Sequence, residues 1–514
     1  LGDRSAYTIG KLLRRGIARR ARGVCVKERV MSNAIRDLVK VAGDAIQVAA
    51  VRSPVGSSEV LATTALEVSV RDERALRASG IDALVWAAVF GPPEQQAAAR
   101  WLIWEIAQAL GIRPASIHEL YIARGRNALD HDFTTPAMNI RMMAYDTARA
   151  AMRAVVEGKV GAFIFEIARS EMSYTDQRPA EYVSVMLAAA IKEGYRGPLF
   201  IQGDHFQVNA KKYKSDADAE LAALRKLIDE ALAAGFYNID IDTSTLVDLS
   251  KPTLDEQQRA NYELCALFSD YIRQRQPAGV IVSLGGEIGE IGHKNSDVHE
   301  LRAFMNGYLR QIKHQPGLSK ISVQTGTTHG GVVLPDGSIA QVNIDFEALR
   351  ELSIAAREEY GLGGAVQHGA STLPEEAFGK FVQSGAIEVH LATAFQQIAY
   401  AHLPKALNDE ITEWLFKNAA DERKPGDTDE QFLHKTRKKA TGPFKQALWS
   451  LPEADRARIR TALQERFAML FNRLRVENTK SMVESFVTSR EIHKQPEDFG
   501  VAPVVAEDVR GLAD

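Results

Sequence analysis

The chain has 514 residues, of which 45% are hydrophobic and 25% are charged, and its formal net charge is -3 at pH 7. This composition is typical of a globular protein with a sizeable core, and the small negative charge argues against a nucleic-acid partner. The two cysteines, Cys25 and Cys265, exclude a disulfide framework and fit a reducing, cytoplasmic compartment. Because no run of about 18 apolar residues is present, we expect no membrane span.

Residues 1–128 are expected to form an N-terminal α/β extension. Basic residues are dense between residues 14 and 29, but no apolar run follows them, so the segment is not a secretory signal. We expect a solvated, partly helical extension, and a transit peptide or an RNA-binding arm is the alternative. The apolar run Ile81–Phe90 predicts a strand. Residues 93–110 predict a helix, since proline stands at the start and Gly111 follows the end.

Residues 129–402 alternate regularly between short apolar runs and helical patterns. Eight such alternations in about 270 residues predict parallel strands joined by helical crossovers, the α/β arrangement of a (β/α)8 TIM barrel. The expected strands end near residues 140, 166, 205, 242, 287, 326, 368 and 390. In such a barrel the active site lies at the carboxyl ends of the strands.

Residues 403–514 are expected to form a C-terminal helical region. Apolar residues recur at helical spacing in residues 410–418 and 455–475, and residues 424–429 have the composition of a loop. The basic run Lys435–Lys439 is open to two interpretations, a solvated helix face or a contact with an anion, and we favour the solvated face.

Chemically active side chains stand at the ends of four predicted strands. Asp204 and His205 end one strand, and Glu287, His329 and His368 end or follow three others. Because the ends of barrel strands converge, these side chains are expected to share a pocket. Three imidazoles suit an open site for a divalent metal, and Glu287 is either a fourth ligand or a carboxylate that orients a ligand histidine.

Asp204 is placed to exchange a proton with a substrate bound at such a metal, although a structural capping role is the alternative. A metal that polarises a carbonyl stabilises an enediolate and permits cleavage or formation of the next carbon–carbon bond. Glycines after two of the histidines, among them Gly330 and Gly369, allow backbone N–H groups to approach an anion such as phosphate.

The chain resembles the class II, metal-dependent ketose-bisphosphate aldolases over about residues 133–400. The resemblance rests on Gly203-Asp-His, Gly286-Glu-Ile-Gly, Thr328-His-Gly, Gln367-His-Gly-Ala-Ser and Pro136-Ala-Met-Asn-Ile. It implies a divalent metal, most often Zn²⁺, held by His205, His329 and His368, an alternative metal position at Glu287, and Asp204 as proton donor. It also implies that Gly330, Gly369, Ser371 and Thr393 bind substrate phosphate, and that the protein is a homo-oligomer acting on a sugar or sugar phosphate.

The last predicted strand departs from that family. The family usually has Asn-Ile-Asp-Thr-Asp there, whereas this chain has His390-Leu-Ala-Thr393-Ala, so His390 is expected to contact the substrate in place of asparagine. The loop 331–337 also replaces a lysine-bearing loop. Fructose 1,6-bisphosphate therefore does not follow as the substrate.

A second resemblance, to tagatose-bisphosphate aldolase accessory subunits and tagaturonate epimerases, involves residues 203–209, 234–244 and 472–478. Three functions follow. The first is an aldolase that makes or cleaves the C3–C4 bond of a ketose or ketose phosphate. The second is a C4-epimerase that breaks and re-forms that bond, and the third is a non-catalytic aldolase partner, against which the three histidines argue.

Overall fold

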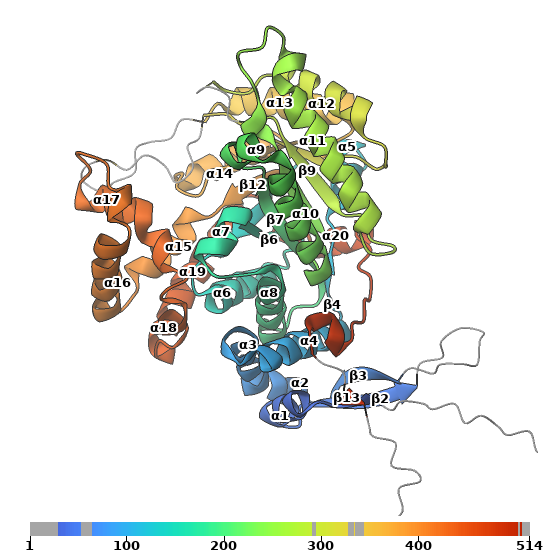
Figure 1. The fold of residues 1–514 in the computed structure, drawn as a ribbon, viewed down its shortest axis with the longest axis vertical. Helices are drawn as coiled ribbons and strands as arrows, with labels where there is room; N and C mark the ends of the chain where they lie inside the picture. Colours follow the sequence, from blue (N-terminus) through green and yellow to red (C-terminus); the bar gives the residue numbers. More distant parts are fainter. Residues whose placement is uncertain are drawn as a thin grey trace, which may run out of the picture.

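The computed structural model describes residues 29–52, 64–289, 294–326, 334, 344–501 and 504–505. Its centre is a closed barrel of eight parallel strands, each paired with the next along the chain, with the last strand pairing back to the first (Figure 1). The strands are β5 (Thr135–Asn139), β6 (Ile164–Ala168), β7 (Gly197–Gln207), β8 (Asn238–Asp242), β9 (Ser283–Glu287), β10 (Lys320–Val323), β11 (Ala365–Gln367) and β12 (Glu388–Leu391). The predicted (β/α)8 TIM barrel is therefore confirmed.

Helices follow the strands and surround the barrel. Several begin at a side-chain cap; Asp216, for example, accepts a hydrogen bond from the backbone N–H of Ala219 at 3.0 Å. The main helices are α6 (Ala144–Glu157), α8 (Pro179–Glu193), α10 (Ala217–Ala234), α11 (Leu254–Arg275), α12 (Val298–Gln311), α13 (Phe346–Tyr360), α14 (Glu375–Gln383) and α15 (Thr393–Ala401). The short helices α7 (Arg169–Tyr174) and α9 (Ala210–Ser215) follow β6 and β7.

The N-terminal part consists of helices, a hairpin and one strand that joins the barrel sheet. Its elements are α1 (Asn33–Val41), β2 (Ile46–Arg52), β3 (Thr64–Val70), α2 (Glu73–Ala75), η1 (Leu76–Gly80), α3 (Ile81–Phe90), α4 (Pro93–Ala109), β4 (Ile112–Ala115) and α5 (His118–Gly125). The helix at residue 93 is confirmed. Strand β4 runs parallel to the start of β7, so the barrel sheet extends into the N-terminal part.

The prediction of a strand at Ile81–Phe90 is wrong, because this segment is helix α3. Helix α3 packs against both α4 and α8, and most of its residues are buried. A run that is buried on nearly all sides carries no periodic pattern, so a short apolar helix cannot be told from a buried strand.

The C-terminal part is mostly helical, and Figure 1 shows its helices on more than one side of the barrel. Its elements are α16 (Lys405–Asn418), η3 (Ala420–Glu422), α17 (Asp429–Thr436), η4 (Arg437–Ala440), α18 (Lys445–Trp449), α19 (Glu453–Arg473), α20 (Lys480–Phe486), η5 (Pro496–Phe499) and β13 (Val504–Val505), which pairs with β1 (Arg29–Val30). The extended segment before η5 returns to α4, where Trp104 donates a hydrogen bond to the carbonyl of Ile492 at 2.7 Å. The domain boundaries at residues 128 and 402 stay predictions.

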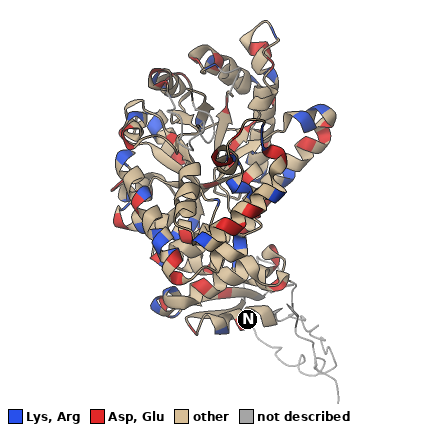
Figure 2. Cartoon of the chain, turned by 90° about the vertical axis from the view of Figure 1, so that its left-hand side faces the viewer, with Lys and Arg blue, Asp and Glu red and all other residues tan. Residues whose placement is uncertain are grey.

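Charged residues of both signs are interspersed over the face shown in Figure 2. None of the described helices combines the length and apolarity that a membrane crossing requires. Cys265 is buried, and Cys25 lies outside the described residues.

Candidate active site

A cavity of about 230 Å³ lies at the carboxyl ends of the barrel strands. Its walls come from the ends of β5, β6, β7, β11 and β12, from α7, and from η4 of the C-terminal part. The lining residues are Asn139, Arg141, Ala168, Ser170, Glu171, Tyr174, Asp204, His205, His368, Gly369, Ser371, His390, Ala392, Thr393 and Lys438. We call this cavity the strand-end pocket.

Most residues that the sequence analysis placed in one site are brought together here. Those in the wall of the strand-end pocket are Asp204, His205, His368, Gly369, Ser371, His390 and Thr393. Glu287 is adjacent, since its Oε2 lies 3.2 Å from Nδ1 of His205. The predictions for His329 and Gly330 fall outside the described residues.

A bulge in β7 brings two consecutive side chains to the same pocket. Strict alternation would point Asp204 and His205 to opposite faces, but the pairing of β7 with β8 shifts by one residue between Gly203 and Phe206. His205 takes a left-handed backbone conformation with φ of 40°. A Cβ atom at Gly203 would lie 2.4 Å from the Phe206 ring, so the tight bulge requires glycine before the acid and the histidine.

His205, His368 and Glu287 form a cluster suited to a divalent cation. One nitrogen or carboxylate oxygen from each of the three lies within 4.8 Å of the other two. Two imidazoles and a carboxylate are a donor set that zinc and similar ions accept. A neighbouring polar group orients each ring: Nδ1 of His205 lies 3.1 Å from the carboxylate of Asp242, and Nε2 of His368 lies 3.0 Å from the hydroxyl of Ser322.

The charges around this cluster also suit a cation. Burial raises the pKa of Glu287 to about 7, and the nearby carboxylate of Asp242 adds to the effect. Burial disfavours the charged form of His205, but the carboxylates of Asp204 and Glu287 outweigh it and raise its pKa well above the usual value. Several buried carboxylates thus surround a single imidazole, whose positive charge can offset only part of their negative charge. A divalent ion bound there would offset more of it.

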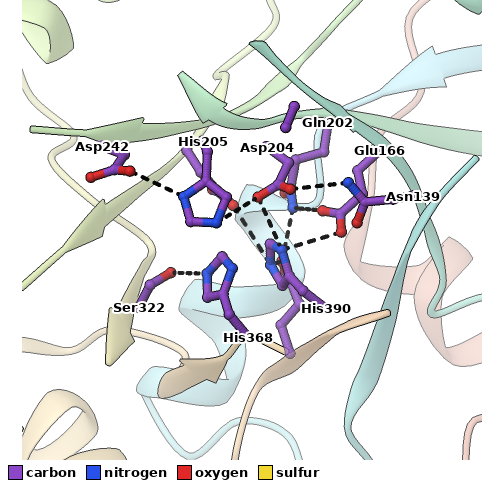
Figure 3. A network of polar contacts seen from close by, with 12 residues as sticks. Asn139, Glu166, Gln202, Asp204, His205, Asp242, Ser322, His368 and His390 are labelled. Carbon is purple, nitrogen blue, oxygen red and sulfur yellow. Dashed lines mark hydrogen bonds and ion pairs between the residues drawn. The ribbon is translucent and has the colours of Figure 1, made fainter. Parts of the chain in front are cut away.

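Asp204 is held from two sides, as Figure 3 shows. The side-chain amide of Asn139 donates a hydrogen bond to its Oδ2 at 3.0 Å, and Nδ1 of His390 lies 3.2 Å from its Oδ1. Burial opposes ionisation of Asp204, but the positive charges of His205 and His390 hold its pKa well below the usual range. The carboxylate is therefore ionised, buried and in contact with an imidazole within the pocket.

A network of buried charges lies beneath the pocket, inside the barrel. The ammonium of Lys320, which is fully buried, donates hydrogen bonds to Gln202 at 2.7 Å, Asp240 at 3.0 Å and Glu388 at 2.5 Å. Glu388 in turn lies 2.7 Å from Nε2 of His390. The network thus runs from Lys320 to the imidazole that contacts the acid of the pocket.

The pKa values of His390 and of the neighbouring acid Glu166 are both strongly shifted. Burial raises the pKa of Glu166 to about 8, and the same acid, at 3.2 Å from Nδ1 of His390, raises the pKa of the imidazole against the opposing effect of burial. Paired groups with pKa values pushed in this way are typical of sites that move protons.

This network was not predicted from the sequence, although strand alternation could have indicated it. Side chains two residues apart on a strand point to the same face, so the residue two positions before a site residue also faces the barrel interior. Gln202 precedes Asp204 in this way, and Glu388 precedes His390. Lys438, by contrast, reaches the pocket from a remote segment that no local pattern connects with it.

Comparison with solved structures finds similar proteins at low sequence identity. The native crystal structure of the fructuronate-tagaturonate epimerase UxaE from Cohnella laeviribosi is 13% identical, with a TM-score of 0.50, and the match covers 84% of this chain and 94% of that one. The YdjI aldolase from Escherichia coli K12 is 14% identical, with a TM-score of 0.43 and coverage of 71% and 99%. Fructose-bisphosphate aldolase from Campylobacter jejuni is 15% identical, with a TM-score of 0.44 and coverage of 72% and 98%.

No curated protein matches the chain. The family model of class-II fructose-bisphosphate aldolase matches residues 125–450, which is more than half of the chain and includes every barrel strand. The chain therefore belongs to the class-II fructose-bisphosphate aldolase family.

Proposed function

We propose that the protein is a divalent-metal-dependent enzyme that makes or cleaves the C3–C4 bond of a ketose or ketose phosphate. The observation that carries this proposal is the carboxylate of Asp204 in the wall of one pocket with His205 and His368, the two imidazoles that form a cation-binding cluster with the adjacent Glu287. An acid–base group beside a cation site is the minimum that aldol chemistry needs when no Schiff-base lysine takes part.

His205, His368 and Glu287 would hold the metal, which we propose to be zinc because imidazole nitrogens dominate the donor set. A divalent cation bound there supplies positive charge to the carbonyl oxygen of the ketose, which makes the adjacent carbon more acidic. The third histidine expected from the sequence, His329, belongs to a segment outside the described residues.

Asp204 is the proposed proton carrier. In cleavage its carboxylate accepts the proton of the C4 hydroxyl, the C3–C4 bond breaks, and the C4 oxygen becomes the carbonyl oxygen of an aldehyde. The electron pair of the broken bond stays on C3 of the fragment that keeps the ketose carbonyl, and this carbon takes up a solvent proton before that fragment is released. Condensation reverses each of these steps. Asn139 and His390 restrict the Asp204 carboxylate to one orientation, which favours transfer along a defined line.

Gly369, Ser371 and Thr393 are proposed to bind a polar or phosphorylated end of the substrate. All three line the strand-end pocket, and the backbone N–H of Thr393, at the start of α15, donates to the hydroxyl of Ser371 at 3.1 Å. Small residues there leave room for an anion beside backbone N–H groups.

C4 epimerisation of a ketose or ketouronate is the second candidate, and the contact between His390 and Asp204 favours it. In this reaction the C3–C4 bond breaks, the aldehyde turns its other face, and the bond re-forms. The aldehyde oxygen then occupies two positions in succession, and two adjacent proton-transfer groups can serve both. The fold likeness to UxaE, which extends beyond the barrel, is compatible with this candidate.

The test is product analysis with the zinc-loaded full chain. Ketoses, ketohexuronates and their phosphates are incubated in D2O and followed by NMR. Three-carbon fragments indicate an aldolase, whereas a C4 epimer that keeps protium at C4 indicates bond cleavage and re-formation. Deuterium at C4 would contradict this mechanism, because it requires removal of the C4 hydrogen. In Asp204→Asn either activity is expected to fall roughly 100-fold or more, and an unchanged rate would contradict the proton-carrier role.

A further inference from the structure

The C-terminal part supplies one wall of the strand-end pocket through η4. This segment is fastened to α7, because the backbone N–H of Gly442 and the hydroxyl of Thr441 donate to the carbonyl of Tyr174 at 3.0 and 3.4 Å. Lys445 adds hydrogen bonds to the carbonyl of Asp176 and to Glu181, both at 2.5 Å. The position of η4 relative to the barrel is therefore set by several independent contacts.

The four cations of the basic run Lys435–Lys439 differ in the groups that they contact. Lys439 forms an ion pair with Glu422, Lys435 donates to the carbonyl of Glu422 at 2.8 Å, and Arg437 lies over the ring of Tyr400 at 5.3 Å. Those three cations are engaged outside the strand-end pocket. Lys438 alone among the cations of the run lines that pocket, at its exposed rim.

Lys438 carries a charge that no described carboxylate offsets at close range. Among the described residues, no carboxylate lies within 4.0 Å of its ammonium, which lies over the Tyr174 ring at 5.9 Å from the ring centroid. The other cation in the wall, Arg141, is already matched by Glu171, to which its Nε donates at 2.5 Å. Burial and the charge of Arg141 lower the pKa of Lys438 by more than the carboxylates of Glu422 and Glu171 raise it.

We infer that Lys438 binds a terminal anionic group of the substrate, a carboxylate or a phosphate, at the rim of the strand-end pocket. This inference rests on the proposed function, because it assigns the substrate class of the same site: ketoses that end in an anion rather than neutral ketoses. A lysine held at the rim contacts the end of the substrate and not the reacting carbons, so it contributes to binding and specificity.

The test uses two anionic probes and one neutral probe with the metal-loaded full chain. Calorimetry measures binding of glycerol 3-phosphate, 4-hydroxybutyrate and glycerol to the wild type, to Lys438→Met and to the matched control Lys435→Met. Losing one charge-assisted contact is expected to weaken binding of one of the anions roughly 10- to 100-fold in Lys438→Met. Glycerol binding, and all binding to Lys435→Met, should stay at the wild-type level.

The anion that loses affinity identifies the group: 4-hydroxybutyrate indicates a carboxylate and glycerol 3-phosphate a phosphate. Equal affinity of Lys438→Met and wild type for both anions would overturn the inference. If a ketose is turned over and Lys438→Met leaves KM for its anionic form unchanged, the inference fails while the proposed function stands. If no ketose is turned over but anion binding depends on Lys438, the proposed function fails and the anion site stands.

Discussion

Replacing Lys320 with methionine removes the positive charge from the network inside the barrel. The Lys320 ammonium is fully buried and donates to Gln202, Asp240 and Glu388 at 2.5 to 3.0 Å. Methionine has a similar length and fills the same space, so the change deletes charge and hydrogen bonds without opening a large cavity. The carboxylates of Asp240 and Glu388 are then left in the barrel interior without their cation.

The expected cost is about 3–5 kcal/mol of unfolding free energy, because removing one partner of a buried ion pair leaves a desolvated charge unpaired. Lys405 provides a matched comparison. It forms an ion pair with Asp409 at the same 2.5 Å, but the two side chains are 87% and 60% exposed. Solvent screens such a pair, so Lys405→Met is expected to cost no more than about 1 kcal/mol.

Urea unfolding measured by tryptophan fluorescence and by circular dichroism tests this difference, provided that the two transitions coincide. In the Glu388→Gln background, Lys320→Met should cost about 1–3 kcal/mol less than in the wild type, because the two residues interact directly. Equal unfolding free energies for Lys320→Met and Lys405→Met would refute the reasoning that burial sets the strength of this network.

Three further predictions concern the metal, the packing and the pH dependence. His368→Ala is expected to lose bound metal in elemental analysis while His402→Ala, outside the pocket, keeps it; full metal content in His368→Ala would exclude it as a ligand. Gly285→Ala places a Cβ 2.3 Å from a carboxylate oxygen of Asp240 and should lower the free energy of unfolding by about 1–3 kcal/mol. The control Gly379→Ala lies in a helix with open space around it and should raise the free energy of unfolding by up to about 1 kcal/mol. Burial opposes ionisation of Glu220, but hydrogen bonds from its arginine partner and a backbone N–H lower its pKa, so its stabilisation is present above the unfolded pKa and is lost as pH falls through the folded pKa. Glu220→Gln should therefore have a lower free energy of unfolding near neutral pH, and this free energy should fall less than that of the wild type as the pH is lowered. The same acid dependence in both proteins would contradict this.

The order of strands and helices, and the residues at the strand ends, were open to prediction from the sequence alone. Alternation of short apolar runs with helical patterns is a local property, and parallel strands joined by helices must place their carboxyl ends together. That is why Asp204, His205, His368 and His390 were assigned to one site and lie in one pocket. The same local patterns failed at Ile81–Phe90, where burial on nearly all sides of the segment erased the periodicity.

Tertiary structure alone decided how those residues are used. The bulge in β7 turns Asp204 and His205 to one side, and strict strand alternation would have separated them. The contacts of Lys320 join strands more than 60 residues apart in the chain, and the charge of Lys438 reaches the pocket from a different part of the fold. Electrostatic partners depend on distance in space rather than on spacing in the chain, so composition and periodicity carry no record of which charges meet.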